Sequence, residues 1–196
     1  WMMTTTNHWR FGSPRAILLA AAVGLAGQVS AIDLAHAQQQ RSAAVSGGSQ
    51  PQLLGQFGDW GAYTANPGGR KVCFALAKPA SGKTDPPNRP RDPAYVFISS
   101  RPADNVQNEV SVMFGYAFKP NAEASLEIGG SNFSLYTQSD GGWVKNAAEE
   151  PRLVEAMRKA GNMTVKGFSS NDTATTDIYT LKGLAQALER ISQECR

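Results

Sequence analysis

The last stretch of the chain, Leu184-Ala-Gln-Ala-Leu-Glu-Arg-Ile-Ser-Gln-Glu-Cys195, has the periodicity of an amphipathic helix. Its apolar residues recur at i, i+4, i+7 and i+11 and so share one helical face: Leu184, Leu188, Ile191 and Cys195. The stripe ends in one of only two cysteines, and the other, Cys73, lies 122 positions earlier (195 − 73). We expect a Cys73–Cys195 disulfide that ties a C-terminal helix to an early strand.

The first residues have the features of a secretory leader. Arg10 and Arg15 precede an apolar run over residues 16–26, which is too short to span a bilayer. Ala35-His-Ala37 fits the small-x-small cleavage rule, and Ala31 is an earlier alternative site. We predict a cleavable signal peptide over residues 1–37, with a retained anchor as the alternative. No later stretch is apolar over enough residues to predict a transmembrane helix.

A cleaved leader implies a periplasmic or secreted, outer-envelope location. Two cysteines form a pair more often than two free thiols in such an oxidising compartment. Closing so long a loop stabilises a fold by at most about 4–5 kcal/mol in the chain-entropy model. Two buried free cysteines are the alternative.

Removal of the leader also removes both histidines, His8 and His36. Lys and Arg then total 17 (19 − 2) and Asp and Glu 15 (16 − 1), so the net charge is about +2. This charge is too small to indicate a nucleic-acid partner. The 159 remaining residues (196 − 37) suit one domain. Residues 38–53, rich in Gln, Ser, Ala and Gly, predict a flexible linker before a single domain over residues 54–196.

The domain alternates short apolar segments with Gly, Asn and Asp turns, which is typical of antiparallel β structure. The expected strands lie at 57–64, 70–77, 94–100, 109–116, 125–128, 133–136, 142–145, 163–168 and 175–181. Five prolines between Lys78 and Pro93 predict a long exposed loop. A short helix near 150–160 and the C-terminal helix complete the pattern. We predict a mainly β fold, an antiparallel β-sandwich or barrel with two helices.

The histidine-free mature chain excludes Ser-His-Asp and Cys-His nucleophilic sites and histidine metal ligation. Paired cysteines leave no thiolate nucleophile or cysteine zinc site. Ser81-Gly-Lys-Thr84 resembles the end of a phosphate-binding loop, but Ala77 stands where the first glycine is needed. We therefore predict no catalytic residue, no cofactor and no metal site.

Carboxylates remain as candidates by residue type for glycoside hydrolysis: Glu109, Glu123, Glu127, Asp140, Glu149 and Glu150. A helix start accounts for Glu149 and Glu150, and a turn or backbone hydrogen bond for Asp59. Asp172 and Asp177 flank the last expected strand, where we expect them to be solvated. Basic residues in and near the proline-rich loop are also expected to be solvated rather than to bind acidic surfaces: Arg70, Lys71, Lys83, Arg89 and Arg91.

Several segments together resemble the invasion-associated locus B family of exported bacterial proteins. They are Phe57-Gly-Asp-Trp60, the Cys73 strand, Glu109-Val-Ser-Val and the ending from Tyr179 to Cys195. The motif positions that carry the resemblance are Phe57, Gly58, Asp59, Trp60, Leu181, Gly183, Leu184, Ala187 and Leu188. Members often have a further cysteine where this chain has Thr64, which leaves one possible pair here. The resemblance implies a mostly β periplasmic or envelope protein, linked in some pathogens to host-cell entry, with no catalytic residues to transfer.

These observations favour a non-enzymatic exported protein that acts through protein–protein or envelope interactions, with a possible part in host-cell invasion. The expected partner is an envelope or host-surface protein. The alternatives are a carboxylate-based hydrolase or small-ligand binder, and a purely structural periplasmic protein. Facing carboxylates in a cleft would support the hydrolase, and a large exposed apolar patch would support a protein partner.

Overall fold

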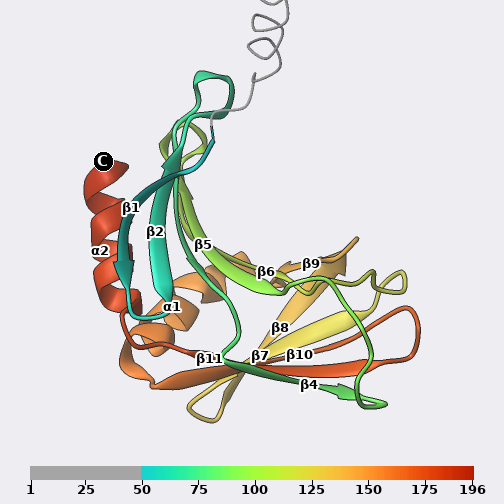
Figure 1. Cartoon of the computed structure of the whole chain (residues 1–196). Helices are drawn as coiled ribbons and strands as arrows, with labels where there is room; N and C mark the ends of the chain where they lie inside the picture. The colour runs from blue at the N-terminus through green and yellow to red at the C-terminus, as the bar shows by residue number, and fades with distance from the viewer. Residues whose placement is uncertain (1–49) are drawn as a thin grey trace, which may run out of the picture. The chain divides into compact units, whose positions relative to one another are not determined.

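The computed structural model describes residues 50–196, and all structural statements concern these residues. The predicted signal peptide and most of the predicted linker lie outside them. Eleven antiparallel strands form one sheet in the order β1-β2-β3-β5-β6-β9-β8-β7-β10-β11-β4, with two α-helices against it (Figure 1). The mainly β, antiparallel class is confirmed, with the strands joined into a single sheet that has β1 and β4 as its edges.

The strands are β1 (Gln52–Phe57), β2 (Trp60–Ala65), β3 (Val72–Ala77), β4 (Ser81–Asp85), β5 (Tyr95–Arg101), β6 (Val106–Met113), β7 (Glu123–Ile128), β8 (Ser131–Gln138), β9 (Gly141–Val144), β10 (Asn162–Phe168) and β11 (Ala174–Thr180). The α-helices are α1 (Glu150–Lys159) and α2 (Leu184–Glu194). The sheet is bent, so that β10, β11 and β4 run across the direction of β1 and β2 (Figure 1).

The inner face of the sheet, on the side of the helices, forms the core. Alternate residues of β3, β5, β6, β7 and β8 are buried there, as period-2 strands require: Ala75, Val96, Ile98, Val110, Val112, Leu126, Phe133 and Leu135. Helix α2 covers β1, β2 and β3, and α1 contacts β6 and α2. The face opposite the helices is called the outer face below.

Both helices follow from their apolar stripes and terminal residues. Helix α1 has Pro151 in its first turn, two basic residues in its last turn, and buries Leu153, Val154 and Met157. Helix α2 buries Leu184, Ala187, Leu188 and Ile191, which confirms the stripe in the sequence. Within the described residues, neither helix combines the length and the apolar character that crossing a membrane requires.

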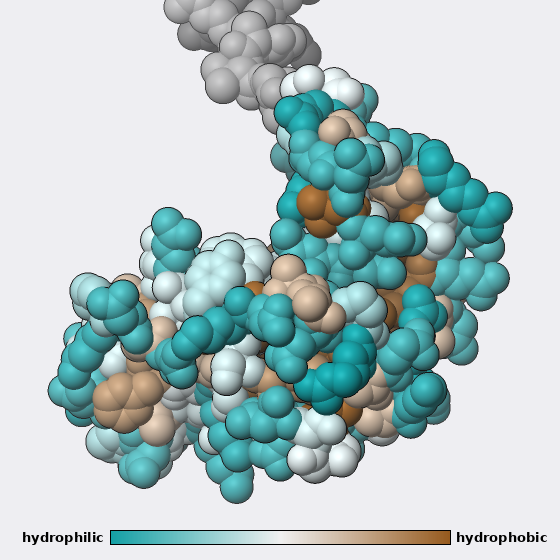
Figure 2. Space-filling model, turned by 180° about the vertical axis from the view of Figure 1, so that it is seen from behind, coloured by the Kyte–Doolittle hydropathy of each residue, from teal (hydrophilic) through white to brown (hydrophobic). Residues whose placement is uncertain are grey.

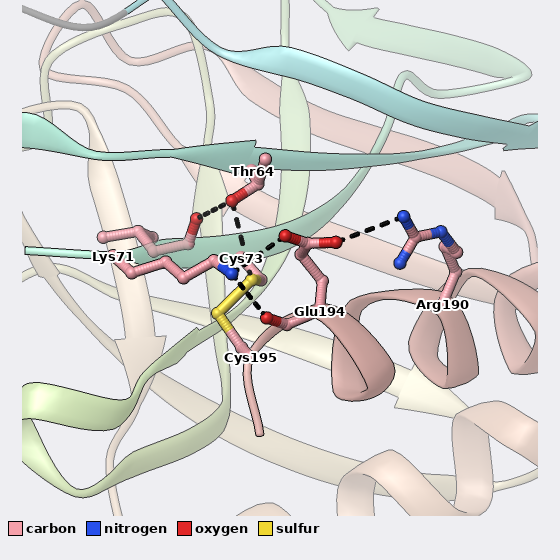
Figure 3. A network of polar contacts seen from close by, with 7 residues as sticks. Thr64, Lys71, Cys73, Arg190, Glu194 and Cys195 are labelled. Carbon is pink, nitrogen blue, oxygen red and sulfur yellow. Dashed lines mark hydrogen bonds and ion pairs between the residues drawn. A yellow bond between two sulfur atoms is a disulfide. The ribbon is translucent and has the colours of Figure 1, made fainter.

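The predicted disulfide joins Cys73 on β3 to Cys195 directly after α2, with their Cα atoms 6.0 Å apart (Figure 3). Cys73 is fully buried. Beside it, the Lys71 ammonium group lies 2.8 Å from Glu194 Oε1 and donates to the Glu194 carbonyl at 2.7 Å. Lys71 lowers the pKa of Glu194, with a further contribution from Arg190. The end of the chain is thus held by one covalent bond and a small ionic network.

Four sequence predictions about the strands and the linker need correction. Phe57-Gly-Asp-Trp60 is not continuous strand, because Gly58 and Asp59 form the tight turn between β1 and β2. The expected loop over residues 78–93 contains β4, which pairs with β11 as an edge strand. The fourth expected strand begins three residues earlier, at Val106. Strand β1 also includes Gln52 and Leu53, which the sequence assigned to the linker.

Candidate functional site

The motif residues that carry the family resemblance lie together and hold the fold. Trp60 is fully buried, and its indole N–H donates to the Thr180 carbonyl at 2.9 Å. The Thr180 hydroxyl donates to the Asp59 carboxylate. Leu181, Leu184, Ala187 and Leu188 are core residues. The Phe57–Trp60 turn is therefore packed against the segment that joins β11 to α2.

Two motif glycines allow this packing of main chain on main chain. A Cβ atom at Gly58 would lie 2.7 Å from the Lys182 carbonyl oxygen, and one at Gly183 would lie 2.0 Å from the Phe57 carbonyl oxygen. Gly183 also has φ +93°, in the region that favours glycine. The motif therefore encodes a structural junction, and a functional surface has to be sought elsewhere.

The end of the sheet near β4 holds a buried ion pair. The Arg91 guanidinium makes a bidentate contact with Asp177, including Nη1 to Oδ2 at 2.7 Å. The Arg91 side chain is 16 % exposed and that of Asp177 1 %, so the expectation that these two residues are solvated is wrong. Hydrogen bonding to Asp177 raises the pKa of Arg91. Next to the pair, Tyr116 shares a 2.6 Å hydrogen bond with Thr175, and burial raises the pKa of Tyr116 to about 12.

Most other candidate charges are engaged in ion pairs on the surface. The ion pairs are Arg70 with Asp104, Lys119 with Asp172, Lys145 with Glu123, Lys166 with Glu127, and Arg152 with Glu149. In the described part of the chain, no group of three or more His, Cys, Asp and Glu residues is arranged to hold a metal ion.

The outer face of the sheet carries aromatic side chains across several strands. Cross-strand register pairs Leu53 with Tyr63, Tyr63 with Phe74, and Phe74 with Ser99. A second row runs through Leu76, Phe97, Ser111, Trp143 and Tyr136. Paired residues lie on the same side of a sheet, so these side chains share one surface. We call this surface the aromatic face: Tyr63, Phe74, Tyr95, Phe97, Tyr136 and Trp143.

The rings of the aromatic face make contacts within two groups and remain partly exposed. Tyr63 stacks on Phe74 at a centroid distance of 5.3 Å, and Tyr136 stacks on Trp143 at 5.6 Å. Phe97 connects Phe74 with Tyr95, at 5.9 and 6.1 Å. Tyr136 is 46 % exposed and the other five rings are half-buried. On the side away from α2, the surface is hollowed at the bend of the sheet (Figure 2).

Polar and charged groups border the aromatic face. Lys78 places its ammonium group 5.6 Å from the centroid of Tyr95. A depression of about 560 Å³ lies at one end, lined by Asp59, Tyr63, Leu76 and Lys78 among others. Glu123 pairs across the strands with Tyr136. An apolar, aromatic centre with a charged border is the composition of a protein-binding surface.

A separate groove of about 530 Å³ lies between β6 and α1. Its lining includes the carboxylates of Glu109 and Glu150. Arg101 holds Glu109 with two hydrogen bonds of 3.0 Å, and Glu150 accepts the Val110 N–H at 2.9 Å. Burial raises the pKa of Glu150, and the nearby Glu109 raises it further. Both candidate carboxylates thus have structural partners.

Sequence reasoning missed the aromatic face. The alternation in Val72–Ala77 and Tyr95–Arg101 already places Phe74, Tyr95 and Phe97 on the face opposite the core. The order of the strands, which brings β9 and β8 next to β6, has no local signal in the sequence.

Comparison with protein-family models shows the family of the chain. The model of the family "Invasion associated locus B (IalB) protein" matches residues 60–192, which is more than half of the chain. No curated protein and no solved structure matches the chain significantly. The matched region runs from Trp60 to the last turn of α2 and so includes most of the junction described above. On this match, the chain belongs to the invasion associated locus B family.

Proposed function

We propose that this protein is exported and non-enzymatic, and that it acts by binding an envelope or host-surface protein through its aromatic face. The observation that carries the proposal is the set of partly exposed Tyr, Phe and Trp rings on the side of the sheet that the helices leave open. Aromatic residues are enriched in protein interfaces and supply most hot spots. An exposed apolar patch of this kind is otherwise unfavourable on a monomer.

The carboxylate alternative has less support. Glu109 and Glu150 share a groove, but Arg101 engages the first and the β6 main chain engages the second. A general acid and a nucleophile need carboxylates that are available to the substrate. We therefore favour binding over hydrolysis. Capture of a host-surface protein would support a role in host-cell invasion.

The test is affinity capture from envelope extract after crosslinking in situ, with matched surface variants. Tyr63→Ser combined with Tyr136→Ser removes two rings from the aromatic face. Phe168→Ser is the control, because Phe168 is 44 % exposed, close to the 46 % of Tyr136, and belongs to β10, which contributes none of the six rings of the aromatic face. We expect one enriched protein that the double variant fails to capture and the control retains.

Three results would contradict the proposal. The first is that no protein is enriched by the parent chain. The second is that the double variant captures the partner as well as the parent chain does. The third is that the Phe168→Ser control loses the partner as completely as the double variant does. Unfolding curves of all three proteins should be measured alongside, so that a loss of capture is not a loss of fold.

A further inference from the structure

Strand β11 carries polar side chains where the strands beside it carry apolar ones. The register places Asp177 next to Val165 of β10, and Val165 next to Leu126 of β7. Of the five buried polar or charged side chains in the described chain, four lie within residues 169–177: Ser169, Thr173, Thr175 and Asp177. Burial of a polar group costs free energy unless the group has a hydrogen-bond partner, so each of these four side chains needs one.

Three of the four side chains have partners within the fold. Asp177 and Thr175 have the partners described above. The Ser169 hydroxyl accepts hydrogen bonds from the main-chain N–H groups of residues 171 and 173, at 3.3 and 3.2 Å. The Thr173 hydroxyl has no hydrogen-bond partner among the described residues, although Thr173 is only 7 % exposed. This hydroxyl is therefore available to a bound molecule.

Thr173 lines a pocket of about 320 Å³ between the segment from β4 to Arg91 and the turn that joins β10 to β11. At this end of the sheet, β4 lies beside β11 (Figure 1). The lining contains two arginines, the amide of Asn171 and no carboxylate. Its volume is at the lower end of the range for small-molecule sites. The lining is rich in hydroxyl groups, from Thr84, Tyr116, Ser169, Ser170, Thr173 and Thr175.

Arg89 supplies the free positive charge of the pocket. Arg91 is neutralised by Asp177, whereas the Arg89 side chain has no ion pair or hydrogen bond within residues 50–196. The Arg89 main-chain N–H donates to the Thr84 hydroxyl at 3.1 Å, which fixes the loop after β4. A neighbouring depression of about 510 Å³ shares Thr84 and both arginines with the pocket and adds Lys83. Lys83 also has no ion pair in the described part of the chain.

Three carboxylates are close to the pocket in the sequence but do not line it. Asp172, which stands between two lining residues, is paired with Lys119. Asp85 and Asp92 each adjoin a lining residue, and neither lines the pocket or the neighbouring depression. A guanidinium group without a carboxylate partner is suited to bind an oxyanion. Hydroxyl and amide side chains both donate and accept hydrogen bonds, as the hydroxyl groups of a sugar do.

We propose that this pocket binds a sugar that carries a phosphate or carboxylate group. Arg89 binds the anionic group, and the Thr173 hydroxyl with its neighbours binds the hydroxyl groups of the sugar. Residues 81–84 contribute as the edge strand β4 and not as a phosphate-binding loop, so the site does not depend on that motif. The site is separate from the aromatic face and does not rest on the function proposed above.

The test uses the oxidised chain and a panel of hexose 1-phosphates, hexose 6-phosphates and hexuronates of the gluco, galacto and manno configurations. Uncharged hexoses and inorganic phosphate are the reference probes. Saturation-transfer NMR identifies the probes that bind, and calorimetric titration measures their affinities.

Two substitutions remove the groups that the proposal uses. Arg89→Gln removes the free charge, and Thr173→Val removes the unpartnered hydroxyl while keeping the shape of the side chain. Arg196→Gln is the control for the first, because Arg196 is exposed and has no ion pair among the residues that the structure describes. Thr176→Val is the control for the second, because Thr176 does not line the pocket.

We expect at least one charged sugar to bind the parent chain, at least tenfold more tightly than the uncharged hexose and inorganic phosphate do. Arg89→Gln should weaken this binding about tenfold or more, and Thr173→Val about threefold to tenfold, while both controls leave it unchanged. Because the Thr173 hydroxyl has no partner in the fold, Thr173→Val should not lower the free energy of unfolding. A loss of affinity in this variant is then not a loss of fold.

The proposal is overturned if no charged sugar of the panel binds the parent chain. It is also overturned if inorganic phosphate or the uncharged hexose binds as tightly as the charged sugar, or if Arg89→Gln or Thr173→Val binds the charged sugar as the parent chain does. A control variant that loses binding as completely as its test variant would equally contradict the assignment of the site.

Discussion

Gly183 is the residue at which the family motif meets the strictest steric demand. Its φ of +93° and the position of the Phe57 carbonyl, 2.0 Å from where a Cβ would lie, leave no room for a side chain. The segment from Leu181 to Leu188 can reach the β1–β2 turn only with glycine here. The motif position is thus explained by packing and needs no ligand.

Gly183→Ala should therefore destabilise the protein strongly. A strained left-handed residue costs about 1–3 kcal/mol, and the clash with Phe57 adds to it. Gly161→Ala is the control, because a Cβ at Gly161 meets nothing within 4 Å. Urea unfolding of the two variants should separate them clearly. Equal free energies of unfolding for Gly183→Ala and Gly161→Ala would show that the junction accommodates a Cβ at residue 183 without loss of stability.

Glu150 should make stability depend on pH in a defined direction. Burial raises its pKa in the folded state, so the folded protein holds the proton more tightly than the unfolded chain does. Its contribution to stability is then present below the unfolded pKa of about 4.3 and is lost as pH rises through the raised folded pKa.

Glu150→Gln isolates this contribution, because the amide oxygen can still accept the Val110 N–H. The unfolding free energy of the parent chain minus that of Glu150→Gln should fall as pH rises above about 4.3. Urea titrations at a series of pH values measure it. A difference that stays flat or increases would contradict the raised pKa.

At the scale of elements, the Arg91–Asp177 pair fixes the segment after β4 to strand β11. Asp177 is almost completely buried, and Arg91 also donates to the Phe114 carbonyl at 3.4 Å. Removing one partner leaves a buried charge without compensation. Asp177→Ala should cost about 3–5 kcal/mol of unfolding free energy.

The double variant Arg91→Leu with Asp177→Leu distinguishes the pair from simple packing. Replacing both charges by apolar side chains removes the desolvation penalty, so we expect it to be more stable than Asp177→Ala. Thermal and urea unfolding of the parent chain, Asp177→Ala and the double variant would measure the difference. A double variant that is no more stable than Asp177→Ala would contradict this expectation.

The disulfide is the second device that joins distant elements, here β3 and α2. Reduction should lower the unfolding free energy by about 2–4 kcal/mol and at most about 5, since it releases a loop of 122 residues. The exposed Lys71–Glu194 pair is screened by solvent and would not hold the helix end alone. Denaturation with and without reductant measures the effect, and alkylation with mass analysis confirms the redox state. Superimposable curves would argue against the role assigned to Cys195.

At the scale of the whole molecule, the sequence predicts elements well where the pattern is local. The stripe of α2, the β7–β8 hairpin with its Gly129-Gly130 turn, and the cysteine pair all follow from short-range periodicity and composition. Strand β4 could not be found in this way. Its residues Ser-Gly-Lys-Thr-Asp are polar because it is an edge strand, and only its pairing with β11 makes it a strand.

The candidate surfaces depend on contacts between distant residues and are correspondingly harder to predict. Asp177 looks like a solvated acid until the chain brings Arg91 to it from 86 positions away. The aromatic face needs β8 and β9 to be placed beside β6, and the groove needs β9 to be shorter than β6. Local periodicity identifies which side of a strand is buried, but long-range pairing decides what the exposed sides form together.

The Cys73–Cys195 bond also sets how the chain would respond to mechanical force. A pull on the two ends of the described domain is carried across the disulfide, so residues between the cysteines stay in a closed ring. Only the segment before Cys73, which forms the β1–β2 hairpin, can unravel. From Gln52 to Cys73 that is 21 residues (73 − 52), an extension of about 70–75 Å. Reduction would release about 400 Å more, so the oxidised protein would act as a short extensible segment in series with a locked ring.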